Sequence, residues 1–383
     1  MIKVGYISPV NPETDRMSWS GTYYNSFHAI KNTGLDIKWI PYTSHKFLYK
    51  VTTKFAKVNY KLVYGNGSAD HSRFMEVAHK YLINKNILDD VDLIFVPGQI
   101  DIVAGLRTDK PIIYYTDGTF KSMINYYWFG FSRRAINEGN KLEKLAISRA
   151  KFNFRASHWA ANSTIKDYGA KSDHTYVFPF GADVPKNINR ISIPDYKNKR
   201  LKLMFSGKDW MRKGGNIAVA TAEYLNQIGI NTELFIVGPS SLPKDITDKK
   251  FVHFIGYINK NDKSDYKKYF KIYYECNAFI LPTRAECAGL VFCEANAFGM
   301  PIFSTDTGGI SDYVKNKVNG YRLPLSANGQ DFGKCIEKVY KEKRFDILSE
   351  GARKMYQTSN NWEAWSRHFK DFVDKNRLEF KHE

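Results

Sequence analysis

The stretch LPTRAECAGLVFCEANAFGMP, residues 281–301, decides the fold of this chain. It follows an apolar run at 278–281 that predicts a buried strand, and its closing glycine and proline end a short helix. Glu286 lies in the loop that leaves the strand, and Glu294 lies eight positions later, inside the helix. Ligands bind at the carboxyl ends of strands in an open parallel sheet, and free amides at a helix start suit a phosphate. A lone glutamate is more often a solvated surface residue. Here a strand end, two spaced glutamates and a helix start occur together, and this combination favours a ligand site.

Strands alternate with helical segments along the rest of the chain. Strand-like runs occur at 92–97, 111–116 and 233–237, and another starts at Leu201. This alternation predicts an α/β protein made of βαβ units with parallel sheets. The 383 residues exceed the usual size of one core, so two domains are expected. The segment 184–200 is rich in Asn, Lys and Pro, has no clear periodicity and reads as the linker between them.

The charge balance indicates which partners are plausible. Lys and Arg number 57 against 39 Asp and Glu, a net charge of +18, which predicts attraction to nucleotide diphosphates or anionic lipid head groups. A lysine-rich solvated surface explains part of this excess, and no block of five or more like charges marks a nucleic-acid tail. Nucleic acid is therefore not an expected partner. No run of about eighteen apolar residues occurs, so we expect a cytoplasmic protein, with peripheral docking at the inner face of the membrane left open.

A glycine-bounded loop at 207–215, GKDWMRKGG, forms a second candidate element between a strand and a helix. Its two lysines, Lys208 and Lys213, can converge on a diphosphate and stabilise the charge that develops on it as a leaving group. The loop matches neither the Walker pattern nor the G-x-G-x-x-G fingerprint. Solvent exposure is the ordinary alternative for either lysine, but the position of the pair between two strands favours a phosphate site.

Two further candidates lie in the first half of the chain. Gly21 stands in a Ser-Gly-Thr sequence after the first strand, where it lets the backbone approach a ligand or simply precedes a helix start. Asp117 directly follows the strand 111–116, where it either serves a ligand site or starts a turn through its own side chain. We interpret both as candidate site residues.

Taken together, these motifs resemble the retaining glycosyltransferases of family four. The resemblance rests on the spaced glutamates Glu286 and Glu294, on the two lysines of the loop 207–215, and on the Pro-x-Gly-x-Asp turn at 179–183. It implies the GT-B fold, in which two Rossmann-like domains face each other across a cleft and a C-terminal helix crosses back to the first domain. The implied parts are an acceptor-binding domain 1–183, a linker 184–200, a nucleotide-sugar-binding domain 201–355 and a helical segment 356–383 that packs back on the first domain.

The resemblance also implies roles for the residues of the opening stretch. Glu286 would contact the hydroxyls of the donor sugar, the amides near Gly289 and Leu290 would hold its diphosphate, and Glu294 would bind the ribose hydroxyls. Ala288 departs from the pattern, because many members of the family carry a bulkier residue there. This difference changes the expected shape of the sugar pocket.

The other motifs receive roles in the same way. Lys208 and Lys213 would bind the donor phosphates, and Gly21 would face the phosphates and the acceptor. Asp117 would orient a donor hydroxyl or assist proton transfer. The predicted catalytic residues are therefore Asp117, Glu286 and Lys213. No metal is expected, because the Asp-x-Asp sequence at 90–92 precedes a buried strand.

The predicted function is metal-independent, retaining transfer of a sugar from a UDP- or GDP-sugar to a hydroxyl of a glycan or lipid-linked acceptor, with no cofactor. An anionic membrane surface is a further candidate partner. Two alternatives stay open: a GT-B enzyme of other chemistry, such as a nucleotide-sugar epimerase or a phosphorylase, and a non-catalytic protein that binds nucleotide-sugars or polyanions. A phosphorylase would need a cofactor-bearing lysine or a second phosphate site, and no motif indicates one.

Overall fold

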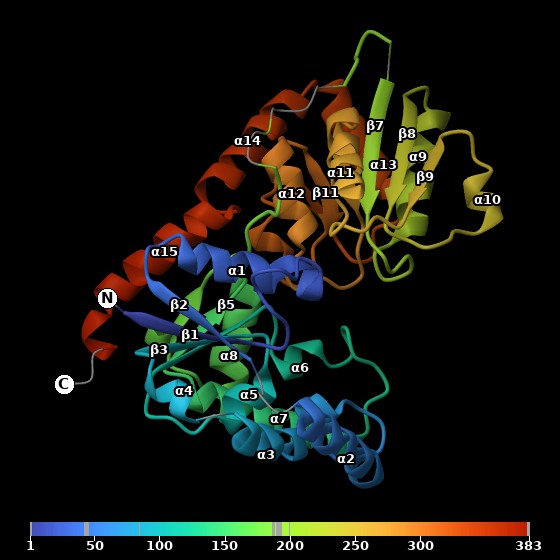
Figure 1. Ribbon diagram of the computed structural model, residues 1–383. Coiled ribbons are helices and arrows are strands. Elements are labelled where there is room, and N and C mark those ends of the chain that lie inside the picture. Colours follow the sequence, from blue (N-terminus) through green and yellow to red (C-terminus); the bar gives the residue numbers. More distant parts are fainter. Residues whose placement is uncertain are drawn as a thin grey trace. The chain divides into compact units, whose positions relative to one another are not determined.

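The computed structural model describes residues 2–41, 46–83, 85–185, 188, 194–198 and 200–380. They form two compact units, one made of Met1–Pro179 with Trp365–Glu383 and the other of Phe180–Ala364 (Figure 1). Much of the predicted linker 184–200, and the last three residues of the predicted C-terminal segment, lie outside the described residues. The predicted limits of the functional domains stay predictions.

The first unit is built on a parallel sheet of six strands in the order β2-β1-β3-β4-β5-β6. The strands are β1 (Lys3–Ser8), β2 (Asp36–Pro41), β3 (Leu93–Pro97), β4 (Ile112–Thr116), β5 (Phe152–Arg155) and β6 (Thr175–Val177). Strands β3, β4 and β5 are buried along their whole length, which is why their sequences are apolar runs without alternation.

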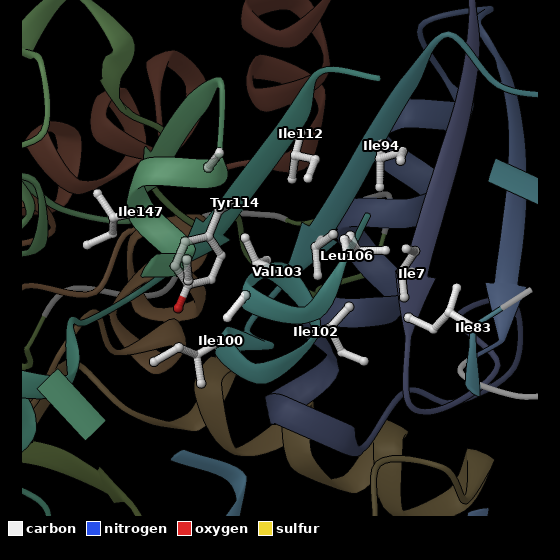
Figure 2. Close-up of a cluster of buried hydrophobic side chains, with 14 of the residues drawn as sticks. Ile7, Ile83, Ile94, Ile100, Ile102, Val103, Leu106, Ile112, Tyr114 and Ile147 are labelled. Carbon is white, nitrogen blue, oxygen red and sulfur yellow. The ribbon is translucent and has the colours of Figure 1, made fainter. Parts of the chain in front are cut away.

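Helices cover this sheet and close its core. They are α1 (Thr22–Lys31), α2 (Lys46–Tyr64), α3 (Arg73–Leu82), α4 (Lys85–Asp89), α5 (Ile100–Gly105), α6 (Phe120–Met123), α7 (Arg133–Arg149) and α8 (His158–Tyr168), with the short 3-10 turns η1 (Ser18–Gly21), η2 (Ala69–His71) and η3 (Ser172–His174). In the core of Figure 2, Ile94 and Ile112 of neighbouring strands belong to one buried cluster with Ile102 of α5 and Ile147 of α7. Each such side chain, fully buried, stabilises the unit by about 1.5–3 kcal/mol.

The C-terminal segment returns to the first unit, as the resemblance predicts. Helix α15 (Trp362–Lys375) and the turn η5 (Arg377–Glu379) end the described chain. The Trp365 ring stacks on Phe369 at 5.0 Å, and its Nε1 donates to the hydroxyl of Tyr115 on β4 at 3.3 Å. The Ser366 hydroxyl donates to the carbonyl of Ala29 on α1 at 2.7 Å. Trp365 is almost fully buried, so this helix is part of the first core.

The second unit holds another six-stranded parallel sheet, in the order β12-β11-β10-β7-β8-β9. Its strands are β7 (Arg200–Ser206), β8 (Asn231–Val237), β9 (Val252–Gly256), β10 (Ala278–Leu281), β11 (Ile302–Thr305) and β12 (Gly320–Leu323). Read from β9, this is the Rossmann strand order. The direction of winding changes between the neighbours β7 and β10, so the loops that leave these two strands meet at the topological switch point, where ligands bind in such sheets.

The helices of this unit connect its strands or pack behind them. They are α9 (Gly215–Gln227), α10 (Lys244–Thr247), α11 (Lys263–Glu275), α12 (Leu290–Phe298), η4 (Ile310–Asp312), α13 (Gly329–Lys341) and α14 (Phe345–Thr358). The predicted strand at 278–281 and the helix after it are confirmed as β10 and α12.

Candidate functional site

The loops after β7 and β10 are bound to each other at the switch point. Gly214 has a φ of +73°, and a Cβ there would lie 2.0 Å from the carbonyl oxygen of Pro282, so only glycine fits this close approach. The amide of Arg284 donates to the carbonyl of Arg212 at 2.7 Å. The Arg212 guanidinium in turn donates to the carbonyl of Ala285 at 3.1 Å. These contacts fix the positions of the two predicted ligand-binding loops relative to each other.

With the loops held in this way, Lys213 and Glu286 form an ion pair. Only 12% of the Lys213 side chain and 8% of the Glu286 side chain are exposed. Gly207 makes room for the lysine, since a Cβ at that position would lie 2.8 Å from Cγ of Lys213. Charges removed from water interact more strongly with a polar ligand. The structure thus places a cation and a carboxylate, both predicted from the sequence, in one sheltered position.

Helix α12 begins just beyond this pair. Gly289 is its N-cap residue, with a φ of +75°, and no side chain caps the helix there. A Cβ on Gly289 would lie 2.6 Å from the Phe292 ring and 3.1 Å from Cγ of Glu286. A larger residue at this position would therefore displace the glutamate side chain. The first turn from Leu290 therefore presents backbone amides and the positive end of the helix dipole close to Glu286. This arrangement suits a phosphate group.

Glu294, in the body of α12, is buried, and both of its carboxylate oxygens have partners. Its side chain is 2% exposed and is ion-paired through Oε1 with Lys260. Its Oε2 accepts hydrogen bonds from the hydroxyls of Tyr269 at 2.8 Å and Tyr273 at 2.9 Å. Burial lowers the pKa of Lys260, but the charge and hydrogen bond of Glu294, together with Tyr269 and Asp183, raise it, and the net shift is upward. Burial first, and then Glu294, raise the pKa of both phenols, which keeps them protonated donors.

No sequence motif marked Lys260, Tyr269 or Tyr273 as a site residue. Helix α11 is rich in Lys and Tyr and resembles a solvated surface helix. One signal was available, because Tyr269 and Tyr273 stand four residues apart and so share one face of the helix, and Phe270 lies buried beside them. A buried face that carries two phenols requires hydrogen-bond partners, and Glu294 meets that need.

The two loop lysines differ in their surroundings. Lys208 is exposed, and its Nζ lies 4.8 Å above the ring of Tyr257, which is 47% exposed. The structure therefore brings Lys213, and not Lys208, to the carboxylate of Glu286. Ala288 is buried beside Gly289, so the departure from the family pattern falls on the inner side of the loop.

The first unit holds the other two predicted site residues, Gly21 and Asp117. Trp19, Ser20 and Gly21 adopt left-handed φ values of 48°, 55° and 83°, and Gly21 is the N-cap residue of α1. Such a conformation costs a residue other than glycine about 1–3 kcal/mol and is concentrated at functional loops. The surrounding structure therefore imposes the shape of this loop on Trp19 and Ser20.

Asp117 follows β4 and lies close enough to α1 for its charge to act there. The hydroxyl of Tyr23, in the first turn of α1, accepts a hydrogen bond from Gln99 Nε2 at 2.6 Å. Burial raises the pKa of Tyr23, and the carboxylates of Asp101 and Asp117 raise it further. The structure therefore brings Asp117 and the helix after Gly21 to the same edge of the first sheet.

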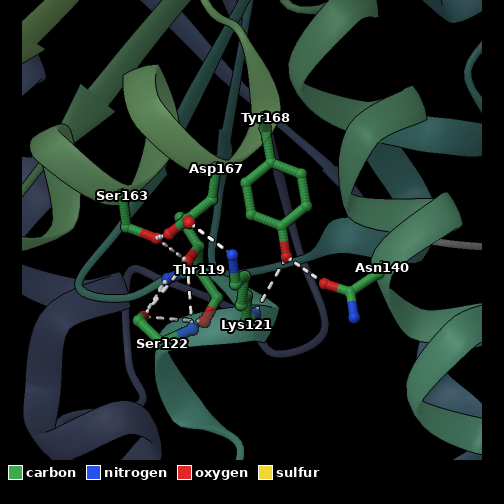
Figure 3. A network of polar contacts seen from close by, with 7 residues as sticks. All are labelled: Thr119, Lys121, Ser122, Asn140, Ser163, Asp167 and Tyr168. Atoms are coloured by element: carbon green, nitrogen blue, oxygen red, sulfur yellow. Dashed lines mark hydrogen bonds and ion pairs between the residues drawn. The ribbon is translucent and has the colours of Figure 1, made fainter.

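A network of side chains fixes the loop that carries Asp117 (Figure 3). Thr119 caps α6 and shares a 2.6 Å hydrogen bond with Ser163 of α8. Ser163 donates to Asp167 at 2.7 Å, and Lys121 pairs with the same carboxylate at 2.6 Å. The hydroxyl of Tyr168 accepts from the Lys121 amide at 2.9 Å. The loop is thereby tied to α8 along two turns of that helix.

Within the described ranges, no three His, Cys, Asp or Glu side chains gather where they could hold a metal ion. Among the helices of the described part of the chain, none is both long enough and apolar enough to cross a membrane.

Most of the second unit matches a known protein family. Residues 189–362 match the family described as glycosyl transferases group 1. This span covers nearly all of the unit Phe180–Ala364 and contains Lys208, Lys213, Glu286 and Glu294. The part of the chain that matches this family, residues 189–362, is called the group 1 domain. At this level the resemblance to family-four glycosyltransferases is confirmed.

Two curated relatives match a region of about the size of the group 1 domain. One is the D-inositol 3-phosphate glycosyltransferase of Paenarthrobacter aurescens (strain TC1), 24% identical over 195 residues, which is 47% of this chain and 46% of the relative. The other is the UDP-Gal:alpha-D-GlcNAc-diphosphoundecaprenol alpha-1,3-galactosyltransferase of Escherichia coli, 27% identical over 194 residues, which is 46% of this chain and 48% of the relative. The match thus spans about half the length of these relatives.

A solved structure extends the likeness beyond the group 1 domain. The sucrose-phosphate synthase from Thermosynechococcus elongatus superposes with a TM-score of 0.66 over 99% of this chain and 100% of that chain, at 15% sequence identity. At this identity the likeness shows the fold alone. Together with the two parallel six-stranded sheets, it confirms the predicted GT-B fold.

Proposed function

We propose that this chain is a glycosyltransferase that moves a sugar from a nucleotide-diphosphate donor to a hydroxyl acceptor. The observation that carries the proposal is the sheltered pair of Lys213 and Glu286 beside the uncapped start of α12, at the switch point of a group 1 domain. A carboxylate accepts hydrogen bonds from sugar hydroxyls, while an ammonium group and helix-start amides bind phosphate oxygens. A sugar diphosphate presents both kinds of group next to each other.

The reaction breaks the bond between the anomeric carbon and the diphosphate oxygen and forms one from that carbon to the acceptor oxygen. The bonding pair leaves with the diphosphate, and the proton of the acceptor hydroxyl passes to the departing diphosphate oxygen. Lys213, with Lys208 and the amides of α12, would stabilise the developing negative charge in place of a divalent cation. For this, Lys213 exchanges Glu286 for phosphate, which frees the carboxylate for the sugar. Attack on the face from which the diphosphate departs would retain configuration, a step that rests on the family resemblance.

Glu294 is the proposed ligand for the ribose hydroxyls. A carboxylate offers about four acceptor positions, and Lys260, Tyr269 and Tyr273 take three of them. A ribose hydroxyl would take the remaining position or displace Lys260. The exposed ring of Tyr257 beside Lys208 offers a surface on which a base can stack. The donor is proposed to be a UDP- or GDP-sugar, and the name of the Escherichia coli relative, which includes UDP-Gal, supports UDP.

The first unit is proposed to bind the acceptor. Asp117 would orient a hydroxyl or assist the proton transfer, and the backbone at Gly21 would approach the substrate. The acceptor is proposed to be a glycan or a lipid-linked sugar, which the name of the Escherichia coli relative supports because it includes a diphosphoundecaprenol-linked sugar.

A donor screen tests this proposal. The protein is incubated with UDP-, GDP- and ADP-sugars in the presence of a chelator, with free and lipid-linked sugar acceptors, and products are identified by mass spectrometry. We expect free nucleotide diphosphate from at least one donor and a glycosylated acceptor. Failure of every donor to bind or turn over would refute the proposal.

The same screen separates the two alternatives. The net charge of +18 also fits a protein that only binds polyanions or nucleotide-sugars. Such a protein would take up a donor without turnover. A nucleotide-sugar epimerase would convert the donor sugar in the absence of any acceptor.

A further inference from the structure

Helix α2, Lys46–Tyr64, has an apolar face that no described part of its own unit covers. It lies at the outer edge of the first unit, beside α3 (Figure 1). One face packs inward: Ala56 and Tyr60 are each 3% exposed, and the Tyr49 ring stacks on His79 at 5.8 Å. These three positions recur every seven and four residues, so they form one stripe that attaches the helix to the unit.

A second apolar stripe points to solvent. Its members recur at intervals of four, three and four residues, and their exposed fractions are 50% for Val51, 68% for Phe55, 54% for Val58 and 79% for Leu62. At 100° per residue, this stripe lies well over a quarter-turn away from the buried one. Phe47, 82% exposed, extends it at the start of the helix. A contiguous apolar patch of this length on a surface marks an interaction site.

Lysines border this exposed stripe. Lys50, Lys54, Lys57 and Lys61 recur at the same intervals of four, three and four residues, one position before each member of the stripe. All four are exposed and line one shallow groove. The nineteen residues of α2 contain no Asp or Glu. The exposed surface of the helix is therefore an apolar band with a continuous row of positive charge along one side.

We propose that α2 docks this protein on an anionic lipid bilayer, with the Phe55 face in the acyl boundary and the lysine row on lipid phosphates. A helix that lies in the interface needs this combination of an exposed apolar face and a basic flank. Lysine stems can cover apolar surface while their ammonium groups stay among the head groups. An array of negative phosphates matches a positive row that continues along the whole helix. The inference deepens the proposed function, because a lipid-linked acceptor lies at such a surface.

Vesicle sedimentation with the full chain tests the inference. The vesicles are pure phosphatidylcholine or phosphatidylcholine enriched in phosphatidylglycerol. We expect binding to the anionic vesicles alone, lost at high salt. Lys54→Gln with Lys57→Gln, and separately Phe55→Ser with Leu62→Ser, should each weaken binding by more than about tenfold. Lys334→Gln with Lys338→Gln, a matched pair of exposed lysines four residues apart on α13, should leave it unchanged.

Three outcomes would overturn the inference. They are absence of binding to anionic vesicles, equal loss in the α13 control, and a soluble dimer that the Phe55 and Leu62 variant dissociates, which would make a second copy the occupant. Circular dichroism and thermal midpoints confirm that each variant is folded. Release of nucleotide diphosphate is measured without vesicles on the same samples, with the donors and the acceptors of the donor screen. Vesicle binding without donor turnover would sustain docking and refute the proposed enzyme, and turnover without vesicle binding would do the reverse.

Discussion

The hydroxyl of Tyr269 donates a hydrogen bond of 2.8 Å to Oε2 of Glu294. The bond joins α11 to α12 and, with Tyr273 on the same oxygen and Lys260 on the other, it fixes the direction of a buried carboxylate. If Glu294 binds the ribose, the hydrogen bond from Tyr269 contributes to the affinity for the nucleotide.

Tyr269→Phe should raise the KM for the donor by about tenfold or more, with little change in kcat. Loss of a hydrogen bond to a charged group costs about 1.5–3 kcal/mol, and the carboxylate would lose its alignment for the nucleotide. Tyr224→Phe is a matched control, because the Tyr224 hydroxyl donates to Glu337 at 3.0 Å on the surface between α9 and α13. An unchanged KM in Tyr269→Phe, or an equal rise in the control, would contradict the assigned role.

Glu286→Gln should separate sugar recognition from phosphate recognition. The amide holds the donor sugar less well and no longer competes with phosphate for Lys213. We expect kcat/KM for the donor to fall by about tenfold or more, while the affinity for the nucleotide diphosphate alone stays the same or rises. Calorimetric titration and initial rates measure the two quantities.

A surface pair serves as the control for this variant. Glu223→Gln removes the carboxylate that pairs with Lys249 at 2.9 Å, and both values should stay at those of the unmodified chain. A parallel fall in affinity for donor and for nucleotide diphosphate in Glu286→Gln would show that this carboxylate does not act on the sugar.

Gly214→Ala should destabilise the second unit more than Gly229→Ala. Both glycines have left-handed φ values, +73° and +84°, which cost any other residue about 1–2 kcal/mol. Only at Gly214 does the added Cβ also meet an atom, the carbonyl oxygen of Pro282 at 2.0 Å, whereas Gly229 faces open space. Urea unfolding midpoints compare the two variants, and equal losses would mean that the two loops are not in close contact.

Sequence alone predicted the parts of this fold that depend on local pattern. The apolar run that became β10, the short helix that contains Glu294 and the glycine-bounded loop before α9 are set by neighbours along the chain. The partners of Glu294 depend on tertiary packing instead, because Lys260 stands 34 positions away and Tyr269 stands 25 positions away. The exposed apolar stripe of α2 also depends on tertiary packing, because the sequence does not show which of the two apolar faces of the helix the unit covers.

His71→Phe should reduce the loss of stability in weak acid. The ring of His71 packs against Phe120 at 5.1 Å and Trp128 at 4.6 Å, and its Nδ1 is buried. Burial lowers the pKa of this histidine to about 4, although Asp101 opposes the shift. The unfolded chain, with a histidine pKa near 6.5, therefore binds more protons below that pH. The stabilising contribution is complete above about pH 6.5 and is lost as the pH falls towards about 4.

At pH 5 the difference amounts to about 2 kcal/mol. Unfolding midpoints at pH 7.5 and pH 5 measure it in the unmodified chain and in His71→Phe, whose ring does not titrate. We expect a smaller gap between the two midpoints in the variant. An identical gap would show that His71 does not titrate abnormally.

In the proposed function, the switch point of the second sheet binds the diphosphate of a nucleotide-sugar through Lys213. The most direct test of this binding is calorimetric titration of UDP and GDP, with a chelator present, into the unmodified chain, Lys213→Met and the surface control Lys249→Met. We expect one of the two nucleotides to bind the unmodified chain and the control equally well, and Lys213→Met to weaken this binding by about tenfold or more. Equal affinity in all three proteins, or no binding to any of them, would rule out this role of Lys213.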